Sequence, residues 1–164
     1  MPMTISTEGL EDLDKMLAQL GSKAQDVAKG SLYKGAGVAA DAFTKAVNSI
    51  ATEPFKYARS GTMRLPSPEE KAALVGRTGI AKFKVTGGEV DTLIGVTEAG
   101  GYAMINGHKK AVRLIARSIN SGTSFMAKQP VFRMAVNACK ATAQAAIVAK
   151  AEEMFDEIIN GSGL

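Results

Sequence analysis

Residues 120–159 read NSGTSFMAKQPVFRMAVNACKATAQAAIVAKAEEMFDEII, and this segment constrains the architecture more than any other part of the chain. From Phe132 onward, apolar residues recur every three or four positions, the spacing that places side chains on one face of a helix. Pro130 suits the first helical turn because its missing N–H leaves no bond unmade, and Gly161 suits a left-handed cap. The pattern predicts a helix of roughly 28 residues, about 42 Å long, which exceeds what a small core requires.

A second long helical pattern lies in the N-terminal third of the chain. Leucines at positions 10, 13, 17 and 20 form an apolar stripe, Gly21-Ser22 marks either a break or a kink, and the stripe resumes from Ser22 to about Ala51. Gly30, Gly35 and Gly37 each weaken a helix by up to about 1 kcal/mol relative to Ala. We interpret them as a small-residue face that lets another helix approach closely. A phosphate-binding loop is disfavoured because the Lys-Ser/Thr pair is missing.

Residues 52–88 are rich in Pro and Gly and interrupt the helical pattern. Ser67-Pro68-Glu69-Glu70 nevertheless predicts a short helix, with a Ser cap, Pro in the first turn and Glu70 closing a capping box. Residues 77–85 fit either a helical turn or a strand. The segment contains Lys56, Arg59, Arg64, Lys71, Arg77, Lys82 and Lys84. We interpret it as an exposed, partly mobile, basic insertion.

Strand patterns follow this insertion. Residues 90–96 are β-rich, residues 98–101 resemble a turn, and residues 102–105 resemble the hairpin partner. Asn106-Gly107 favours a tight turn into a third strand over residues 110–119, and residues 3–7 resemble a short edge strand. The sequence therefore predicts a single α+β domain over residues 1–164, in which a small antiparallel sheet packs against long N-terminal and C-terminal helices.

Composition limits the class of protein. With 46% apolar and 22% charged residues in 164, the chain is ordinary for one globular domain. Cys139, the single cysteine, falls on the predicted buried stripe, where it acts as a small apolar residue. No apolar run is long enough to span a bilayer, and residues 1–9 lack a secretion-signal pattern. We expect synthesis in the cytoplasm, no signal-directed export and no membrane partner.

Positive charge is concentrated in the middle of the chain. Residues 54–117 carry eleven Lys or Arg against five acidic residues, a net charge of +6, whereas residues 1–53 carry −2 and residues 118–164 are neutral. Such a basic segment is either a solvated surface, a contact for DNA phosphates or a contact for an acidic partner. No nucleic-acid-binding motif or aromatic stacking platform accompanies it. A non-specific nucleic-acid-binding protein is therefore the alternative function.

Catalytic chemistry finds little support in the sequence. His108 is the only histidine and follows a turn, where exposure is expected. One His and one Cys cannot supply the four ligands of a closed zinc site. Glu152, Glu153, Asp156 and Glu157 fit a solvated or partner-docking helix face. We expect no enzyme activity, metal or cofactor; a small enzyme ranks third among the hypotheses.

Four segments together resemble a known family. They are Gly9-Leu10-Glu11-Asp12-Leu13, Thr78-Gly79-Ile80, Gly122-Thr123 and Pro130-Val131-Phe132-Arg133-Met134-Ala135. In this order they resemble the head–tail joining, or neck and tail-completion, proteins of long-tailed bacteriophages. The chain departs from that family in having Asn120-Ser121 where an acidic residue usually precedes Gly-Thr, and in its additional Pro66–Pro68 segment.

The resemblance implies a structural virion protein without enzymatic activity. Members form homo-oligomeric rings, commonly of six copies, between the head-side connector and the tail terminator or tail tube, and double-stranded DNA passes through the lumen without sequence-specific contacts. We expect assembly in the host cytoplasm and a final location at the head–tail interface of the virion. The repetition of one head-to-tail contact closes such a ring.

Two sets of candidate site residues follow. The candidates for contact with DNA or an acidic partner are Lys82, Lys84, Lys109, Lys110 and Arg113. The candidates for a junction between subunits, or between sheet and helix, are Gly122, Thr123, Phe125, Pro130 and Phe132.

Overall fold

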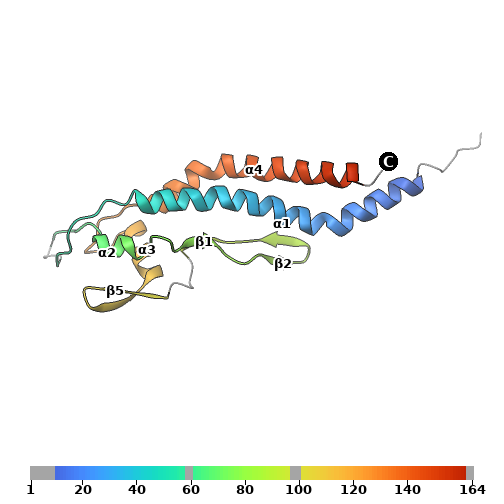
Figure 1. Ribbon diagram of the computed structural model, residues 1–164. Coiled ribbons are helices and arrows are strands. Elements are labelled where there is room, and N and C mark those ends of the chain that lie inside the picture. The colour runs from blue at the N-terminus through green and yellow to red at the C-terminus, as the bar shows by residue number, and fades with distance from the viewer. Residues whose placement is uncertain (1–9, 58–60, 97–100, 162–164) are drawn as a thin grey trace, which may run out of the picture.

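Two long antiparallel helices lie side by side and form the length of the molecule (Figure 1). The computed structural model describes residues 10–57, 61–96 and 101–161, with side chains described from residue 21 onward. Helix α1 spans Leu10–Asn48 and α4 spans Val131–Gly161. At 1.5 Å per residue they are about 58 and 46 Å long. The predicted long helices are confirmed, and α1 continues through Gly21-Ser22 without a break.

Two glycines of α1 allow the close approach of α4. A Cβ atom added to Gly30 would lie 2.7 Å from the sulfur of Met154, and one added to Gly35 would lie 3.0 Å from the carbonyl oxygen of Ala143. At Gly35 the added atom would also lie 2.7 Å from the Cδ1 of Ile147, so a side chain at either glycine would require its neighbours on α4 to shift. The predicted close packing is therefore confirmed at these positions, whereas nothing lies within 4 Å of the corresponding point at Gly37.

The shorter elements form three separate two-stranded antiparallel ribbons. Strand β1 (Thr78–Ile80) pairs with β4 (Ile94–Val96), β2 (Lys84–Thr86) with β3 (Glu89–Asp91), and β5 (Tyr102–Ile105) with β6 (His108–Ala111). Asn106 and Gly107 have φ of 49° and 73°, as a tight hairpin turn of this type requires. The fold is α+β as predicted, and residues 77–85 contain strands.

The predicted three-stranded sheet is wrong in two respects. Residues 94–96 pair with residues 78–80 and not with Tyr102–Ile105. Residues 112–121 form helix α3 (Val112–Ser121), not a strand. The helix buries Val112, Ile115, Ala116 and Ile119 together, whereas a strand would have placed Ile115 on the same face as Arg113 and Arg117. The predicted edge strand at residues 3–7 lies outside the described residues.

The main apolar core lies at one end of the helix pair. It contains Val47, Ile50, Ala73, Leu74, Ile105, Val112, Ile115, Ala116, Ile119 and Met126. These residues come from the end of α1 and the turn after it, from the turn that follows α2 (Pro68–Ala72), from β5 and α3, and from the loop before α4. Beyond this core, α1 and α4 continue side by side, and the β1–β4 and β2–β3 ribbons lie along α1 (Figure 1). The molecule is consequently elongated.

Part of the predicted exposed insertion, residues 52–88, belongs to the interior. Arg64, Ser67, Glu70 and Leu74 are all buried, so the predicted exposure is wrong for this part. The Ser67–Glu70 capping box is confirmed, with both of its hydrogen bonds present. Lys71 also donates hydrogen bonds to the carbonyl oxygens of Asn48 and Ile50, at 2.8 and 3.0 Å, and so caps the end of α1. Lys82 and Lys84 are exposed, as predicted.

Candidate functional site

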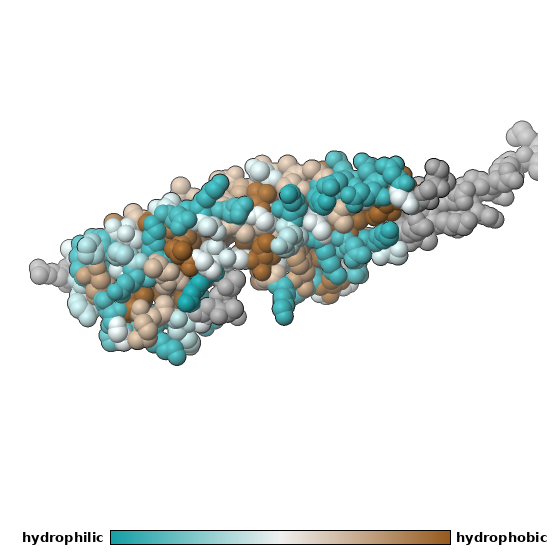
Figure 2. Space-filling view, in the orientation of Figure 1, coloured by the Kyte–Doolittle hydropathy of each residue, from teal (hydrophilic) through white to brown (hydrophobic). Residues whose placement is uncertain are grey.

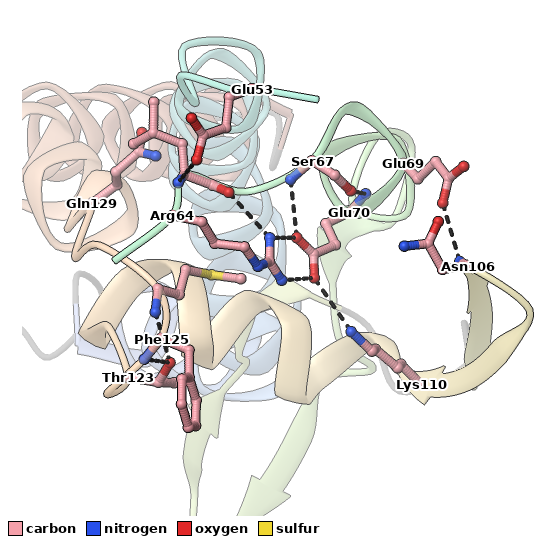
Figure 3. A network of polar contacts seen from close by, with 12 residues as sticks. Glu53, Arg64, Ser67, Glu69, Glu70, Asn106, Lys110, Thr123, Phe125 and Gln129 are labelled. Carbon is pink, nitrogen blue, oxygen red and sulfur yellow. Dashed lines mark hydrogen bonds and ion pairs between the residues drawn. The ribbon is translucent and has the colours of Figure 1, made fainter. Parts of the chain in front are cut away.

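A buried ion pair organises the polar side of the core (Figure 3). The guanidinium of Arg64 donates two hydrogen bonds to the carboxylate of Glu70, at 2.6 and 2.7 Å. The same carboxylate accepts from the backbone N–H of Ser67 at 2.9 Å, and the Nζ of Lys110 lies 3.4 Å away. Arg64 and Glu70 are 8% and 2% exposed. The pair joins α2 to the β5–β6 ribbon through Lys110.

The surroundings of Glu70 keep its carboxyl ionised. Burial alone would raise its pKa, but the hydrogen bonds from Arg64 and Ser67 and the positive charges of Arg64 and Lys110 outweigh burial and lower the pKa. Glu70 is therefore a structural anion and not a proton carrier near neutral pH.

The backbone around Arg64 fixes the loop that leads to α4. The N–H of Arg64 donates to the carbonyl of Phe125 at 2.9 Å, and the N–H of Ala127 donates to the carbonyl of Arg64 at 2.9 Å. Within the loop, the hydroxyl of Thr123 accepts hydrogen bonds from the N–H groups of Phe125 and Met126 (Figure 3). These bonds fix the backbone of the loop, in which Phe125 is 61% exposed.

A surface hollow of about 550 Å³ lies beside this ion pair. Its basic side chains are Arg64, Lys109, Lys110 and Arg113, and its exposed apolar ones are Tyr102, Leu114 and Phe125. Arg64 and Glu70 form its buried part. The Nζ of Lys109 lies 4.5 Å from the centre of the Tyr102 ring, a cation–π contact that holds the ammonium over the rim. The residues from β5–β6, α3 and the 122–126 loop thus create a basic and apolar concavity, which we call the hollow.

The hollow combines residues from both predicted sets. Lys109, Lys110 and Arg113 line it together with Thr123 and Phe125, although the sequence suggested separate roles for the two groups. Lys82 and Lys84 lie elsewhere, in and beside β2, where the neighbouring Phe83 ring is 6.2 Å from that of Tyr33 in α1. The predicted basic contact set is therefore divided between two places.

The remaining junction residues lie between helices. Gly122 ends α3 with φ of 75° and ψ of 169°. Pro130 precedes α4, and the ring of Phe132 stacks on that of Phe43 in α1, with 5.5 Å between centroids. Gln129, which the sequence analysis did not select, joins the same elements because its side-chain amide donates to and accepts from the backbone of Ala51, both at 2.9 Å.

Sequence reasoning missed the roles of Tyr102, Leu114 and Arg64 in the hollow. Only Glu70 carried a local signal, the capping box, and that signal did not indicate its Arg64 partner. His108 is exposed and Cys139 is buried, as predicted. Among the described residues, no group of three or more His, Cys, Asp or Glu side chains is placed to hold a metal ion.

The lining of the hollow combines positive charge with apolar surface. Its net charge is positive, its exposed walls are aromatic or aliphatic, and its one carboxylate accepts hydrogen bonds from Arg64 and Ser67.

None of the described helices has the length and apolar character needed to cross a membrane. Comparisons of the chain with protein-family models, curated proteins and solved structures found no match.

Proposed function

We propose that this chain is a structural virion protein of the phage neck. In this proposal copies of the chain form a homo-oligomeric ring, of six copies by the resemblance, that joins the head connector to the tail terminator or tail tube and lets double-stranded DNA pass. The chain has no catalytic role, acts at the head–tail interface of the virion, and is assembled in the host cytoplasm.

The exposure of α4 is the observation that supports this proposal most. Although α4 has 31 residues, Ala135 and Cys139 are its only buried ones. Residues two positions apart on a helix lie about 200° apart, so Ala141 and Ala145 face away from Ala143, which contacts α1. Val148 is 55% exposed and continues the outward row. Over residues 141–148, α4 is therefore apolar on opposite faces, as expected of a helix between two partners, and α1 supplies only one of them.

Other exposed apolar side chains extend this argument over the surface. Among the described residues, Tyr33, Tyr57, Met63, Leu93, Tyr102, Met104, Phe125 and Met134 are each at least 59% exposed. Figure 2 shows apolar patches between hydrophilic areas along the molecule. Large exposed apolar areas rimmed by polar residues mark surfaces that partners cover. An assembling subunit accounts for them better than a free monomer does.

The test is assembly, measured with the full chain. We expect the protein to form a discrete ring-sized particle by light scattering and electron microscopy, and to add to purified heads or tails that lack it. Ala145→Arg on the outward face of α4 should weaken this assembly, whereas Gln25→Arg, which adds the same charge on exposed α1 surface, should not. A monomer at all concentrations that binds neither heads nor tails would refute the proposal.

Non-specific nucleic-acid binding is the second candidate, and the hollow is the observation that favours it. Lysines 109 and 110 and Arg113 would neutralise phosphates, and the exposed aromatic residues Tyr102 and Phe125 line the same hollow. Under this alternative, labelled single- and double-stranded DNA should bind with an affinity that falls steeply as salt rises. Ring-sized particles with negligible affinity for free DNA would favour the neck protein instead.

A further inference from the structure

The hollow presents positive charge and apolar surface side by side. Lysines 109 and 110 and Arg113 supply positive charge beyond the buried Arg64–Glu70 pair. Tyr102 is 59%, Leu114 54% and Phe125 61% exposed, so apolar surface lies among the cations. A phosphate or a carboxylate alone would leave these apolar walls uncovered. A helix or peptide with carboxylates between apolar residues covers both.

The last turns of α4 have this composition. Glu152, Asp156 and Ile159 are four and three positions apart, so they lie on one face of the helix. All three are exposed, and Val148 precedes them on the same face. Met154, two residues from Glu152, points the other way, into the contact with Gly30 of α1. The acidic end of α4 therefore offers two carboxylates between two aliphatic side chains, away from its own α1.

One copy of the protein cannot bring these two surfaces together. The hollow includes the 122–126 loop, just before α4 begins at Val131, whereas Ile159 is about 42 Å farther along the helix at 1.5 Å per residue. Figure 1 shows the end of α4 and the β5 region at opposite ends of the molecule. Complementary surfaces at opposite ends of one chain meet only between copies.

We propose that the hollow receives the acidic end of α4, residues 148–159, from a neighbouring copy. Glu152 and Asp156 of that copy meet Lys109 and Arg113, while its Val148 and Ile159 cover Leu114 and Phe125. Each copy donates one α4 end and accepts another, so the contact is heterologous and repeats around a ring. This inference rests on the proposed ring in that it names the surfaces by which copies join.

Charge exchange tests the contact without any phage component. The variant K109E/R113E makes two basic side chains of the hollow acidic, and E152K/D156K makes two acidic side chains at the end of α4 basic. We expect each variant alone to dissociate at concentrations at least about tenfold above those at which the original protein does, because like charges then face each other. An equimolar mixture should assemble again, since each hollow then meets an end of opposite charge. Sedimentation velocity over a concentration series measures all three states.

Two controls keep the result specific. K82E/K84E changes the same amount of charge outside the hollow and should assemble like the original protein. Circular dichroism should show unchanged helix content in every variant, which separates lost contact from lost fold.

The inference is overturned if the original protein is monomeric, if both variants assemble normally, or if the mixture fails to recover. It is also overturned if K109E/R113E abolishes DNA binding and leaves assembly intact. Failure of the proposed neck function looks different. In that case charge exchange would succeed, but the assembled protein would not add to heads or tails.

Discussion

At the scale of single residues, buried and hydrogen-bonded polar side chains stabilise the end of the molecule that contains the apolar core. The carboxylate of Glu70 accepts from Arg64 and Ser67, which lie just before it in the chain, and it also pairs with Lys110, which comes from the distant strand β6. Removing one partner of a buried ion pair leaves the other charge without compensation. Stability at this point should therefore depend strongly on the charge of one side chain.

We predict that Glu70→Gln lowers the free energy of unfolding by about 3 kcal/mol, because Arg64 stays buried and charged. Chemical denaturation monitored by circular dichroism measures this change. Glu69→Gln is the matched control: Glu69 lies on the same helix and is exposed, so its change should be within about 0.5 kcal/mol. Equal effects of the two substitutions would contradict the assigned role of the pair.

We also predict that the contribution of the Glu70 carboxyl to the free energy of unfolding is lost in acid. Its pKa is lower in the folded chain than in the unfolded one, so its contribution is complete above the ordinary glutamate pKa of about 4.3. The contribution is then lost as the pH falls through the lowered folded-state pKa. Denaturation curves in this acidic range should therefore converge for the original protein and Glu70→Gln, whereas they should stay apart near pH 7. A constant difference at all pH values would contradict the ion pair as the cause.

Gly122 is a second single-residue constraint. Its φ of 75° with ψ of 169° is a conformation that only glycine adopts readily, and an added Cβ would lie 3.0 Å from the Cβ of Lys128. Gly122→Ala should cost about 1–3 kcal/mol of stability, measured by thermal or chemical denaturation. Gly95→Ala in β4, where no atom lies within 4 Å of the added group, should change stability by much less.

At the scale of elements, the antiparallel contact of α1 and α4 depends on missing side chains. Gly35 lies against the backbone of Ala143 and the side chain of Ile147, and Gly30 against Met154. Glycine has a low helix propensity, so Gly30 and Gly35 destabilise α1 as an isolated helix but allow α4 to lie close to it. Gly37 differs because no atom lies within 4 Å of the Cβ that another residue would add there, so it keeps the low helix propensity without allowing a close contact.

Gly35→Ala and Gly37→Ala should consequently have opposite signs. The first forces α4 away from α1, and overpacking of this kind costs about 1–3 kcal/mol. The second only improves helix propensity and should stabilise by up to about 1 kcal/mol. Melting temperatures of the two variants, compared with the original protein, measure the difference. Stabilisation by both substitutions would show that the helices do not approach as closely as described.

At the scale of the whole molecule, stability should be uneven along its length. Ile105, Ile119 and Leu74 are almost completely buried at one end, whereas α1 around Gly30 and α4 around Met154 pack mainly on each other. Local opening requires less free energy where fewer apolar contacts must break. An elongated shape with one compact end also suits a subunit whose far end is completed by a neighbour.

Hydrogen exchange should report this gradient. We expect amides of α3 and the end of α1 near Val47 to exchange slowest, and those of α4 beyond Val148 to exchange much faster in the dissociated protein. Assembly should slow exchange over residues 148–159 and in the hollow, because both become covered. Uniform exchange along α4 in both the dissociated and the assembled protein would contradict the expected gradient of stability between the core and the end of α4.

Local patterns were sufficient for much of the architecture. The two long helices, the Ser67–Glu70 capping box and the Asn106-Gly107 turn were all predictable, because each depends on residues a few positions apart. The burial of Cys139 followed from helical periodicity for the same reason. The helical identity of residues 112–121 was also present in the spacing of Val112, Ile115, Ala116 and Ile119, but a competing alternation obscured it.

Tertiary contacts alone decided the rest. The pairing of residues 78–80 with 94–96, and the bonds that hold Arg64 to Phe125 and Ala127, join segments far apart in the chain. The hollow likewise exists because the β5–β6 ribbon, α3 and the 122–126 loop meet around one core. The sequence identified five of its lining residues but not their proximity, because local periodicity has no information about which distant surfaces become neighbours when apolar area is buried.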